Sequence, residues 1–346
     1  MILFKYLGDK DVFQTVFAKL HAKRLVNETY ISDYAEKCMI SKMKQACSME
    51  YTLRLERLCK DASISKDLNA EFKIYAESIA ERVKLDFRAV VMTSASWPFK
   101  EKSTCGIPAD LQHSAELFFA FYCGKHKDRT LTWFHDVSWG ELAMDCTTTT
   151  YTLRASMFQM AVLLQFNSEL NFTVQQLHES TGIAMDTLLM VLHSLLKFRL
   201  LVRVEERSGG TSTQAALRLE PDTLLCVNDQ YCNKKVHVNI NVPLKAEVQA
   251  QQESTNKSAL ECRRMCIQAT IVRIMKARKS LKHEELVAEV LSQLSLRFQP
   301  DVLMIKAGID VLLDKEYIER AQEEPDVYNY VALNSVPNHL TAKFLL

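Results

Sequence analysis

The chain of 346 residues is 48% hydrophobic and 25% charged, and it contains only 8 glycines and 7 prolines. This length and apolar content suffice for two to four domains, and the scarcity of chain-breaking residues favours a helix-rich protein. The formal net charge of +1 argues against a protein that binds polyanions over its whole surface. The chain has no run of 18 apolar residues, and it becomes charged too early for a signal peptide. We therefore expect an intracellular protein without membrane contact.

The first part of the chain has the apolar spacing of successive amphipathic helices, which predicts a helical bundle over residues 1–83. Ser32 is the expected N-cap of a second helix, with acidic residues in its first turn. Ser65 is the expected N-cap of a later helix. The apolar faces consist of Phe13, Phe17 and Leu20 in the first helix and of Leu68, Phe72, Tyr75 and Ile79 in the later one.

Residues 84–155 predict a small α/β domain. The sequence DFRAVVMTS indicates a strand over residues 86–94, which the following Trp-Pro pair ends, and Pro108 is expected to open a helix. Residues 129–146 predict a β-hairpin that is interrupted at Gly140. The residues on alternate positions of its first arm are Leu131, Trp133 and His135.

Residues 156–243 follow the plan of a winged helix, with three helices followed by a β-hairpin. Two motifs, Ser156 with Gln159 and Thr173 with Gln176, have the spacing of capping boxes and open the first two helices. A glycine at position 182 supplies the stop of the second helix. Two short strands are expected around the Gly-Gly turn at 209–210.

Residues 261–332 repeat this plan. Helices are predicted over 261–279, 282–294 and 300–315, the last with Pro300 at its first helical position, followed by a two-stranded wing. Residues 244–260 are polar and predict a flexible tether between the copies. The expected fold class is therefore mainly α, of the α+β type, with a helical bundle, a small α/β sheet domain and two winged-helix domains.

The ten cysteines are scattered and form no C-x-x-C motif. The closest pairs, Cys226/Cys232 and Cys262/Cys266, lack the second pair or the histidine cluster of a zinc finger. Reduced cysteines in an intracellular protein act as small apolar residues. We therefore predict free thiols, no bound metal and no cofactor.

The sequence IVRIMKARKS, residues 271–280, combines cations with apolar residues at helical spacing. At about 100° per residue, Ile267, Ile271 and Ile274 fall on one helix face and Lys276 on the opposite face. Three interpretations are open at this point: the solvated face of an ordinary helix, a nucleic-acid contact, or a surface that presents one lysine for a specific reaction.

The nucleic-acid interpretation is the weakest of the three. Winged helices commonly bind DNA through their third helix, and neutralising phosphates requires several cations on the docking face. In the second copy this helix has an excess of acidic residues, so we predict no nucleic-acid binding. Its charged residues are Asp301, Asp310, Asp314, Lys306 and Lys315.

An enzyme is also disfavoured by the sequence. It contains no Gly-rich phosphate loop, no G-x-S-x-G motif and no convincing context for a Cys/His nucleophile. His135 and His178 are expected to be structural or surface residues. We therefore predict a non-catalytic protein.

Nine segments of the chain resemble segments of one protein family, and they follow one another in the same order as in that family. They are FKYLGDKDVFQTVFAKLHAKRLV, MISKMKQAC, SKDLNAEF, SWPF, FQMAVLLQFN, LLKFRLLV, VNINVPLK, IVRIMKARK and YIERAQEEPDVYNYVA. These segments resemble the C-terminal half of the cullins, and most closely the subfamily found in SCF-type ubiquitin ligases. IVRIMKARK is similar to the neddylation-site motif of the family.

The cullin resemblance implies a scaffold of a RING-type ubiquitin ligase in the cytoplasm and nucleus. Residues 84–155 would then bind a RING-box protein, whose N-terminal strand joins the sheet built around Val90, Met92, Leu131 and Trp133. The bound RING would hold a ubiquitin-conjugating enzyme, and proximity would drive transfer. A cullin-associated exchange factor is a further partner of the family.

The resemblance also assigns two charged sites. Lys276 matches the acceptor for the ubiquitin-like modifier, which makes residues 261–332 a neddylation domain; a modifier attached there would displace the second winged helix and free the RING. Lys19, Lys23 and Arg24 resemble part of the basic canyon that attracts the acidic tail of the conjugating enzyme. Their alternative interpretation, the solvated face of a bundle helix, stays open.

Two departures from the cullin pattern affect these expectations. The chain begins inside the first bundle helix and lacks the N-terminal repeats that hold substrate adaptors, so adaptor binding is in doubt. A truncated cullin that sequesters the RING-box subunit without ligase activity is therefore the alternative. The chain also continues past the usual Tyr-x-Tyr-x-Ala end into residues 333–346, an atypical tail.

Overall fold

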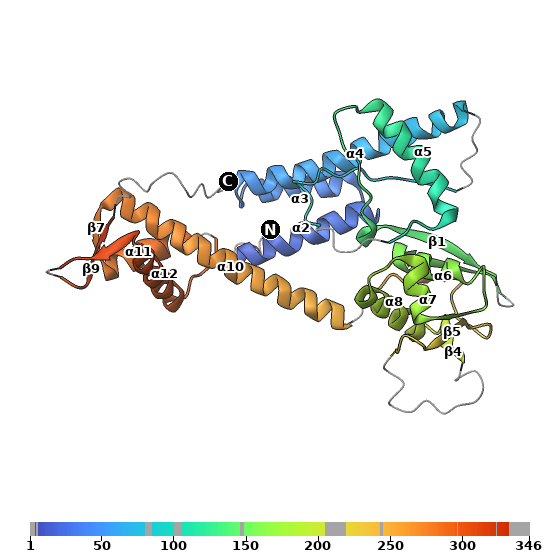
Figure 1. The fold of residues 1–346 in the computed structure, drawn as a ribbon. Helices are drawn as coiled ribbons and strands as arrows, with labels where there is room; N and C mark the ends of the chain where they lie inside the picture. Colours follow the sequence, from blue (N-terminus) through green and yellow to red (C-terminus); the bar gives the residue numbers. More distant parts are fainter. Residues whose placement is uncertain are drawn as a thin grey trace. The chain divides into compact units, whose positions relative to one another are not determined.

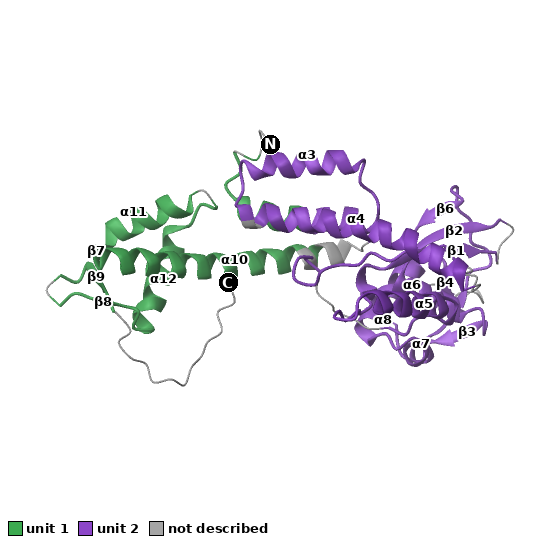
Figure 2. Cartoon of the chain, turned by 90° about the horizontal axis from the view of Figure 1, so that it is seen from above, with its two compact units in different colours: residues 1–18, 246–346 green, residues 19–245 purple. Residues whose placement is uncertain are grey.

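The structure is a computed structural model that describes residues 4, 6–79, 85–99, 105–145, 149–204, 219–242, 245–295, 297–322 and 324–331. It divides into two compact units, which Figure 2 distinguishes by colour: residues 19–245, and residues 1–18 with 246–346. The described residues form mainly helices with three small sheets, which confirms the predicted fold class. None of the described helices is both long and apolar enough to span a membrane.

The first helices of the described chain are α2 (Lys10–Val26), α3 (Asp33–Lys44) and α4 (Met49–Ser78), shown in blue in Figure 1. Ser32 is the N-cap of α3, as predicted, and its side chain accepts a hydrogen bond from the backbone N–H of Ala35. The apolar face predicted for α2 is partly wrong. Leu20 is 51% exposed, whereas Ala18 and Ala22 are buried.

Ser65 does not begin a helix, contrary to the prediction. It lies in the middle of α4, where its hydroxyl donates to the carbonyl of Asp61 at 2.7 Å. No glycine or proline occurs from the N-cap Ser48 to the end of α4, so no residue in the sequence interrupts the helix before Ser65. Leu68 and Phe72 of the predicted stripe are buried.

The α/β region contains α5 (Ala109–Lys125), the 3-10 helix η1 (His135–Val137), β1 (Trp139–Met144), β2 (Tyr151–Ser156) and β6 (His237–Asn239). β2 pairs antiparallel with β1 and parallel with β6. The hairpin predicted for residues 129–146 is wrong, because its first arm is not a strand and β1 pairs with β2 instead. Gly140 lies inside β1 and does not interrupt it. Glycine suits this position because a Cβ added there would lie 2.8 Å from Met160 Sδ.

The first winged helix contains α6 (Met157–Gln165), β3 (Asn171–Thr173), α7 (Val174–Thr181), α8 (Met185–Lys197), β4 (Leu201–Arg203) and β5 (Leu224–Val227). Both predicted capping boxes are present, at Ser156 and Thr173, and Gly182 ends α7 with a φ of 64°. The Gly-Gly turn of the predicted wing lies outside the described residues. β5 pairs with both β3 and β4.

The second winged helix contains α10 (Lys245–Arg278), β7 (Ser280–Lys282), α11 (His283–Leu294), α12 (Val302–Asp314), β8 (Ile318–Arg320) and β9 (Val327–Tyr330). The flexible tether predicted for residues 244–260 is wrong. Residues 245–260 are helical and continue without a break into the helix that carries Lys276, because no glycine or proline interrupts them. Pro300 is not the first helical residue either, since Asp301 caps α12. The tail predicted at 333–346 lies outside the described residues.

The two winged helices belong to separate apolar cores, of which the first also includes residues of β1, β2 and β6. Leu177, Leu188, Leu192 and Leu225 belong to the core of the first and are fully buried. The core of the second consists of residues from α10, α11, α12, the wing and the segment between α11 and α12. Its members are Ile267, Ile271, Ile274, Met275, Leu286, Val290, Leu294, Phe298, Ile305, Ile309, Leu312, Ile318 and Tyr328.

Candidate functional site

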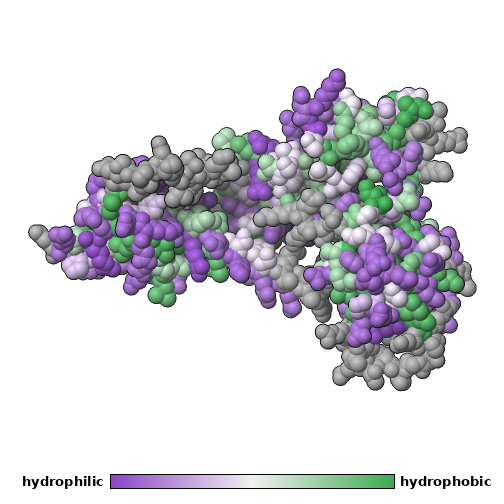
Figure 3. All heavy atoms as spheres, in the orientation of Figure 1, coloured by the Kyte–Doolittle hydropathy of each residue, from purple (hydrophilic) through white to green (hydrophobic). Residues whose placement is uncertain are grey.

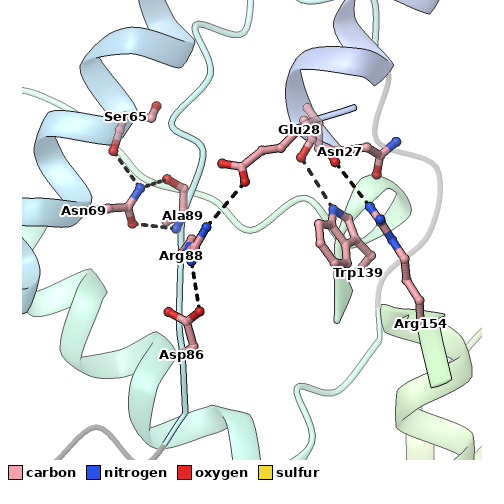
Figure 4. Close-up of polar contacts among 10 residues, drawn as sticks. Asn27, Glu28, Ser65, Asn69, Asp86, Arg88, Ala89, Trp139 and Arg154 are labelled. Carbon is pink, nitrogen blue, oxygen red and sulfur yellow. Dashed lines mark hydrogen bonds and ion pairs between the residues drawn. The ribbon is translucent and has the colours of Figure 1, made fainter. Parts of the chain in front are cut away.

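The backbone of residues 89–93 runs beside α4 and is held there by side chains. The amide of Asn69 brackets Ala89: Oδ1 accepts from the Ala89 N–H at 2.8 Å, and Nδ2 donates to the Ala89 carbonyl at 2.8 Å. One step along, Ser65 Oγ accepts from the Val91 N–H at 2.9 Å. Figure 4 shows Ser65, Asn69 and Ala89. The segment is therefore fastened to α4 as a strand is fastened to a neighbour, but by side chains.

Asp61 extends this pattern by one more position. Its Oδ2 accepts from the Thr93 N–H at 3.0 Å and from Trp97 Nε1 at 2.9 Å. Asp61, Ser65 and Asn69 are four residues apart and therefore lie on one face of α4. The sequence analysis did not assign this role to them. Polar residues at helical spacing beside the buried Leu68 are the signal that identifies them.

The other edge of this segment is open. Backbone groups of successive residues in an extended chain point to opposite sides, so α4 occupies the side of residues 89, 91 and 93. The N–H groups of Val90 and Met92 face away, and none of the described residues accepts a hydrogen bond from them. The strand predicted here is therefore wrong as a member of a hydrogen-bonded ladder, although its backbone is extended.

Leu131 and Trp133 lie in a second segment without regular secondary structure. Both are partly buried against the same aromatic cluster as Ala89. The ring of Trp133 is 6.1 Å from that of Phe87 and 6.2 Å from that of Phe118, measured between centroids. Leu131 and Trp133 thus pack on the aromatic cluster, whereas Val90 and Met92 are not among its members, and the four residues predicted for RING-box binding are not neighbours in a sheet.

A pocket adjoins this cluster on the side of α5. It has a volume of about 470 Å³, and its lining includes Ile107, Phe119 and Trp133. Phe119 is 43% exposed, so the pocket offers an apolar wall to an incoming side chain. The open backbone edge and this pocket lie in the same compact unit.

The end of α2 is fixed to the sheet by two side chains, which Figure 4 also shows. Trp139 Nε1 donates to the Val26 carbonyl at 3.5 Å, and Arg154 Nη2 donates to the Asn27 carbonyl at 3.3 Å. The Arg154 guanidinium stacks on the Trp139 ring at 3.7 Å. These donors satisfy carbonyls that the end of a helix leaves unpaired.

The predicted basic canyon on α2 is less open than its sequence indicates. Arg24 donates to both carboxylate oxygens of Glu36, from Nε at 2.9 Å and from Nη2 at 3.0 Å. His21, which is completely buried, contacts the same carboxylate at 2.9 Å. Burial alone would raise the pKa of Glu36, but Arg24 and His21 lower it overall. Arg24 is thus compensated, whereas Lys23 is exposed and Lys19 half-buried.

The end of α10 has the two faces that its sequence predicts. Ile267 and Ile271 are completely buried, and Ile274 is 2% exposed. Lys276 is exposed, on the opposite face of the same rigid helix. On the face drawn in Figure 3, hydrophilic and apolar residues alternate over the second winged helix without a continuous apolar patch.

The arginines beside Lys276 are engaged with α11. Arg273 Nη2 donates to Gln293 Oε1 at 2.7 Å, and Arg278 Nε lies 3.5 Å from Glu289 Oε2. Both guanidinium groups therefore link the two helices, and the charge of Arg278 is partly compensated by Glu289.

Lys279 is engaged in a different way. It has a φ of 68° and donates its backbone N–H to the Met275 carbonyl at 2.8 Å, which ends the helix. Its Nζ lies 5.3 Å from the centre of the Tyr330 ring. Among the cations at 273–279, all of which the structure describes, Lys276 alone makes no hydrogen bond, ion pair or ring contact through its side chain.

His135 and His178, which are expected to be structural or surface residues, both lie within or beside short helical segments. His178 Nδ1 lies 2.7 Å from the Ile183 carbonyl, across the turn that ends α7. His135 is buried in η1. Nine cysteines lie in the described residues, all of them as free thiols, and Cys146 lies outside.

Models of three cullin domains match this chain. The cullin alpha solenoid domain matches residues 1–69, the cullin alpha+beta domain residues 91–231, and the cullin protein neddylation domain residues 262–324. The neddylation-domain match includes Lys276, and the alpha+beta match includes Met92, Leu131 and Trp133.

Curated relatives match nearly the whole chain. Cullin-1 of Dictyostelium discoideum is 40% identical over 340 residues, and Cullin-1 of Caenorhabditis elegans is 35% identical over 333 residues. Each match covers 96% of this chain but 43% and 42% of the respective relative, so the chain spans less than half of their length. A solved structure described as "A Dual E3 Mechanism for Rub1 Ligation to Cdc53: Dcn1(P)-Cdc53(WHB)" is 36% identical, covering 27% of this chain and 100% of that chain with a TM-score of 0.23.

Proposed function

Because this chain belongs to the cullin family, we propose that it is a non-catalytic scaffold of a RING-type ubiquitin ligase in the cytoplasm and nucleus. It recruits a RING-box protein through residues 85–93 and, through that protein, a ubiquitin-conjugating enzyme. A ubiquitin-like modifier attached to Lys276 activates it. The observation that carries the proposal is the open backbone edge at Val90 and Met92.

The open edge suits β-augmentation. A strand that pairs with Val90 and Met92 completes hydrogen bonds that the described residues leave unmade, so binding gains main-chain bonds at little cost in rearrangement. The anchors on α4 hold the edge in an extended shape before the partner arrives, which lowers the entropy lost on binding. Alternate side chains of the added strand would meet the aromatic cluster around Trp133.

Recruitment of the conjugating enzyme adds an electrostatic step. Lys23 is an exposed member of the proposed basic canyon, whereas the charge of Arg24 is compensated by Glu36. Charges of this kind mainly accelerate the encounter with an acidic partner, and salt reduces this acceleration by screening the attraction. We expect Lys23 to contribute more than Arg24 to binding of an acidic tail.

Lys276 meets the chemical needs of a modifier acceptor. Isopeptide formation requires an amine that can approach a thioester carbonyl, and Lys276 projects from an ordered helix into solvent. The neighbouring Lys279 is a poorer acceptor because its Nζ lies over Tyr330 and its backbone ends the helix. A guanidinium cannot replace the amine, which excludes Arg273 and Arg278.

The test of the scaffold is pull-down of a purified RING-box protein by the full chain. Val90→Pro removes an outward N–H and should weaken binding by at least tenfold, since one ladder bond is lost and the ring obstructs pairing. Val90→Ala keeps the N–H and is the matched control. Leu131→Pro examines the second segment in the same way.

Circular dichroism must show that both proline variants retain the helical fold. Binding that is unchanged in Val90→Pro and Leu131→Pro would refute strand addition at these residues. Loss of binding in Val90→Ala as well would assign the interaction to the side chain rather than to the backbone.

A further inference from the structure

Two cysteines lie one turn apart on α10, outside the sites described above. Cys262 is exposed and Cys266 is half-buried, and no other two cysteines in the sequence are four residues apart. Residues at this spacing are neighbours on the helix surface. Arg297 Nη1 lies 3.9 Å from Cys266 Sγ.

A disulfide does not account for this pair. Side chains four apart on a helix have Cβ atoms about 5–6 Å apart. A disulfide requires Cβ atoms roughly 3.5–4.5 Å apart, so closing one here would require α10 to unwind locally. A disulfide between these two cysteines is therefore incompatible with the intact helix.

A structural zinc site does not account for it either. Such a site needs four ligands, and the described residues contain no group of three or more candidate ligands. A single atom that binds two sulfurs needs no further protein ligand. With bonds to sulfur of about 2.3 Å, the length of a zinc–sulfur bond, one such atom can bridge two thiols that the helix already holds side by side.

We propose that Cys262 and Cys266 form a dithiol site for trivalent arsenicals, thiophilic compounds that are bound by two sulfurs at one arsenic atom. With an organoarsenic oxide, each thiol forms one As–S bond. The As–O bonds break, and the oxygen leaves as water with the two thiol protons. Arsenic remains trivalent throughout, so the reaction needs no oxidant or reductant.

The surroundings prepare the site. Arg263, which lies between the two cysteines in sequence, donates to Asp11 from Nε at 2.6 Å and to Asp9 from Nη2 at 2.8 Å. This clamp holds the turn of α10 that carries the thiols, within one compact unit. Burial raises the pKa of Cys266, and the charge of Arg297 opposes that effect. An ordered helix therefore presents both sulfurs together, and binding a second sulfur requires little additional ordering.

The experiment treats the full chain with phenylarsine oxide in the presence of excess glutathione and measures intact mass. Glutathione competes with single cysteines, whereas a paired site retains the arsenical. We expect one arsenical per chain, removed by a small dithiol. Cys262→Ser and Cys266→Ser should each weaken retention about a hundredfold, because the second bond is no longer intramolecular.

Two controls separate pairing from cysteine content. Cys232→Ser removes an exposed cysteine elsewhere and should keep the arsenical. Cys266→Ser combined with Arg264→Cys restores the number of thiols at a spacing of two, where side chains do not face each other, and should lose it. Retention of the arsenical by either single variant at 262 or 266, or by the respaced variant, would overturn the proposal. Failure of the parent chain to retain it would also overturn the proposal.

Discussion

The two winged helices have the same topology but differ in how deeply their first helices are buried. Both run helix, strand, helix, helix, strand, strand, and their sheets have the equivalent orders β3-β5-β4 and β7-β9-β8. In α6, five consecutive residues from Phe158 to Val162 are buried. In α10, one stripe is buried and the opposite face is exposed.

This difference decides which copy can carry a reactive side chain. α6 packs against β1, as the contact between Gly140 and Met160 shows, as well as against its own α8. Leu163, two residues before the end of α6, is therefore partly buried in the core. The equivalent residue of α10, counted from the helix end, is Lys276. The same fold thus supplies a structural helix in one copy and an accessible one in the other.

The largest effect is expected from removing the acceptor amine. Lys276→Arg keeps the charge and helix propensity but removes the nucleophile, so modification by purified conjugating components should cease while binding of the RING-box protein survives. Lys279→Arg is the matched control and should be modified at the parental rate. The readout is the mass shift of the chain, with the RING-box protein present.

The reciprocal variant sharpens the comparison. Leu163→Lys, combined with Lys276→Arg, places an amine at the equivalent end of α6 and should not restore modification, because that position is partly buried. A modified Lys276→Arg chain whose adduct maps to Lys279 or Lys282 would refute the assignment of Lys276.

A cavity in either core should have a similar effect in the two copies. Ile271→Ala and Leu192→Ala each remove a completely buried side chain and should lower the free energy of unfolding by about 2–5 kcal/mol. Because the residues belong to different compact units, hydrogen exchange should localise each loss to its own winged helix. Val272→Ala, which changes a half-buried residue, is the control and should have a smaller effect. Loss of protection in both units from one variant would contradict this localisation.

Local signals in the sequence predicted much of this architecture. The capping boxes at Ser156 and Thr173, the stop at Gly182 and the stripe of isoleucines on α10 each depend on residues within two turns of one another. The exposure of Lys276 follows from the same periodicity. These features were predictable because tertiary contacts do not compete with them.

Three of the errors have one cause, which is contact between distant segments. The strand expected at residues 86–94 lacks a ladder because its partners are side chains of Asn69 and Ser65 on α4. The first arm of the hairpin near Trp133 packs on an aromatic cluster, and its second arm pairs with β2. Arg24 was predicted to line an open canyon because its partner, Glu36, lies on another helix. Periodicity within one segment contains no information on such partners.

The second helices of the two copies provide a comparison of capping. α7 begins with a complete capping box at Thr173, whereas the equivalent N-cap of α11 is Lys282, whose side chain caps nothing. Thr173→Ala should lower the free energy of unfolding of the first winged helix by about 1 kcal/mol. Lys282→Thr creates the motif T-x-x-E with Glu285 and should raise that of the second by roughly 0.5–1 kcal/mol.

Urea unfolding of the full chain measures both capping changes. Lys282→Ala serves as control for the second variant, since it removes the lysine without adding an oxygen. If Lys282→Thr and Lys282→Ala have the same unfolding midpoint, the added hydroxyl is not capping α11.

The smallest effect concerns the central strand of each sheet and depends on pH. Tyr328 in β9 occupies the place of Leu225 in β5, because each pairs with both neighbouring strands of its sheet. Burial raises the pKa of Tyr328, an effect that the nearby Arg320 opposes. A raised pKa in the folded state means that the contribution to stability is complete below the unfolded value of about 10 and is lost as pH rises above it.

Tyr328→Phe should therefore unfold at slightly lower urea than the parent at pH 8, since the contact between its hydroxyl and His283 Nδ1 at 3.1 Å is lost. Between pH 9 and about 11 the parent should lose more stability than the variant, so that their midpoints converge. Tyr330→Phe, in the same strand, is the matched control and should follow the parent. The equivalent position of the first copy is apolar, so an alkaline loss specific to position 328 distinguishes the two sheets. Parallel pH profiles for the parent and Tyr328→Phe would show that this buried hydroxyl does not control the alkaline stability of the second winged helix.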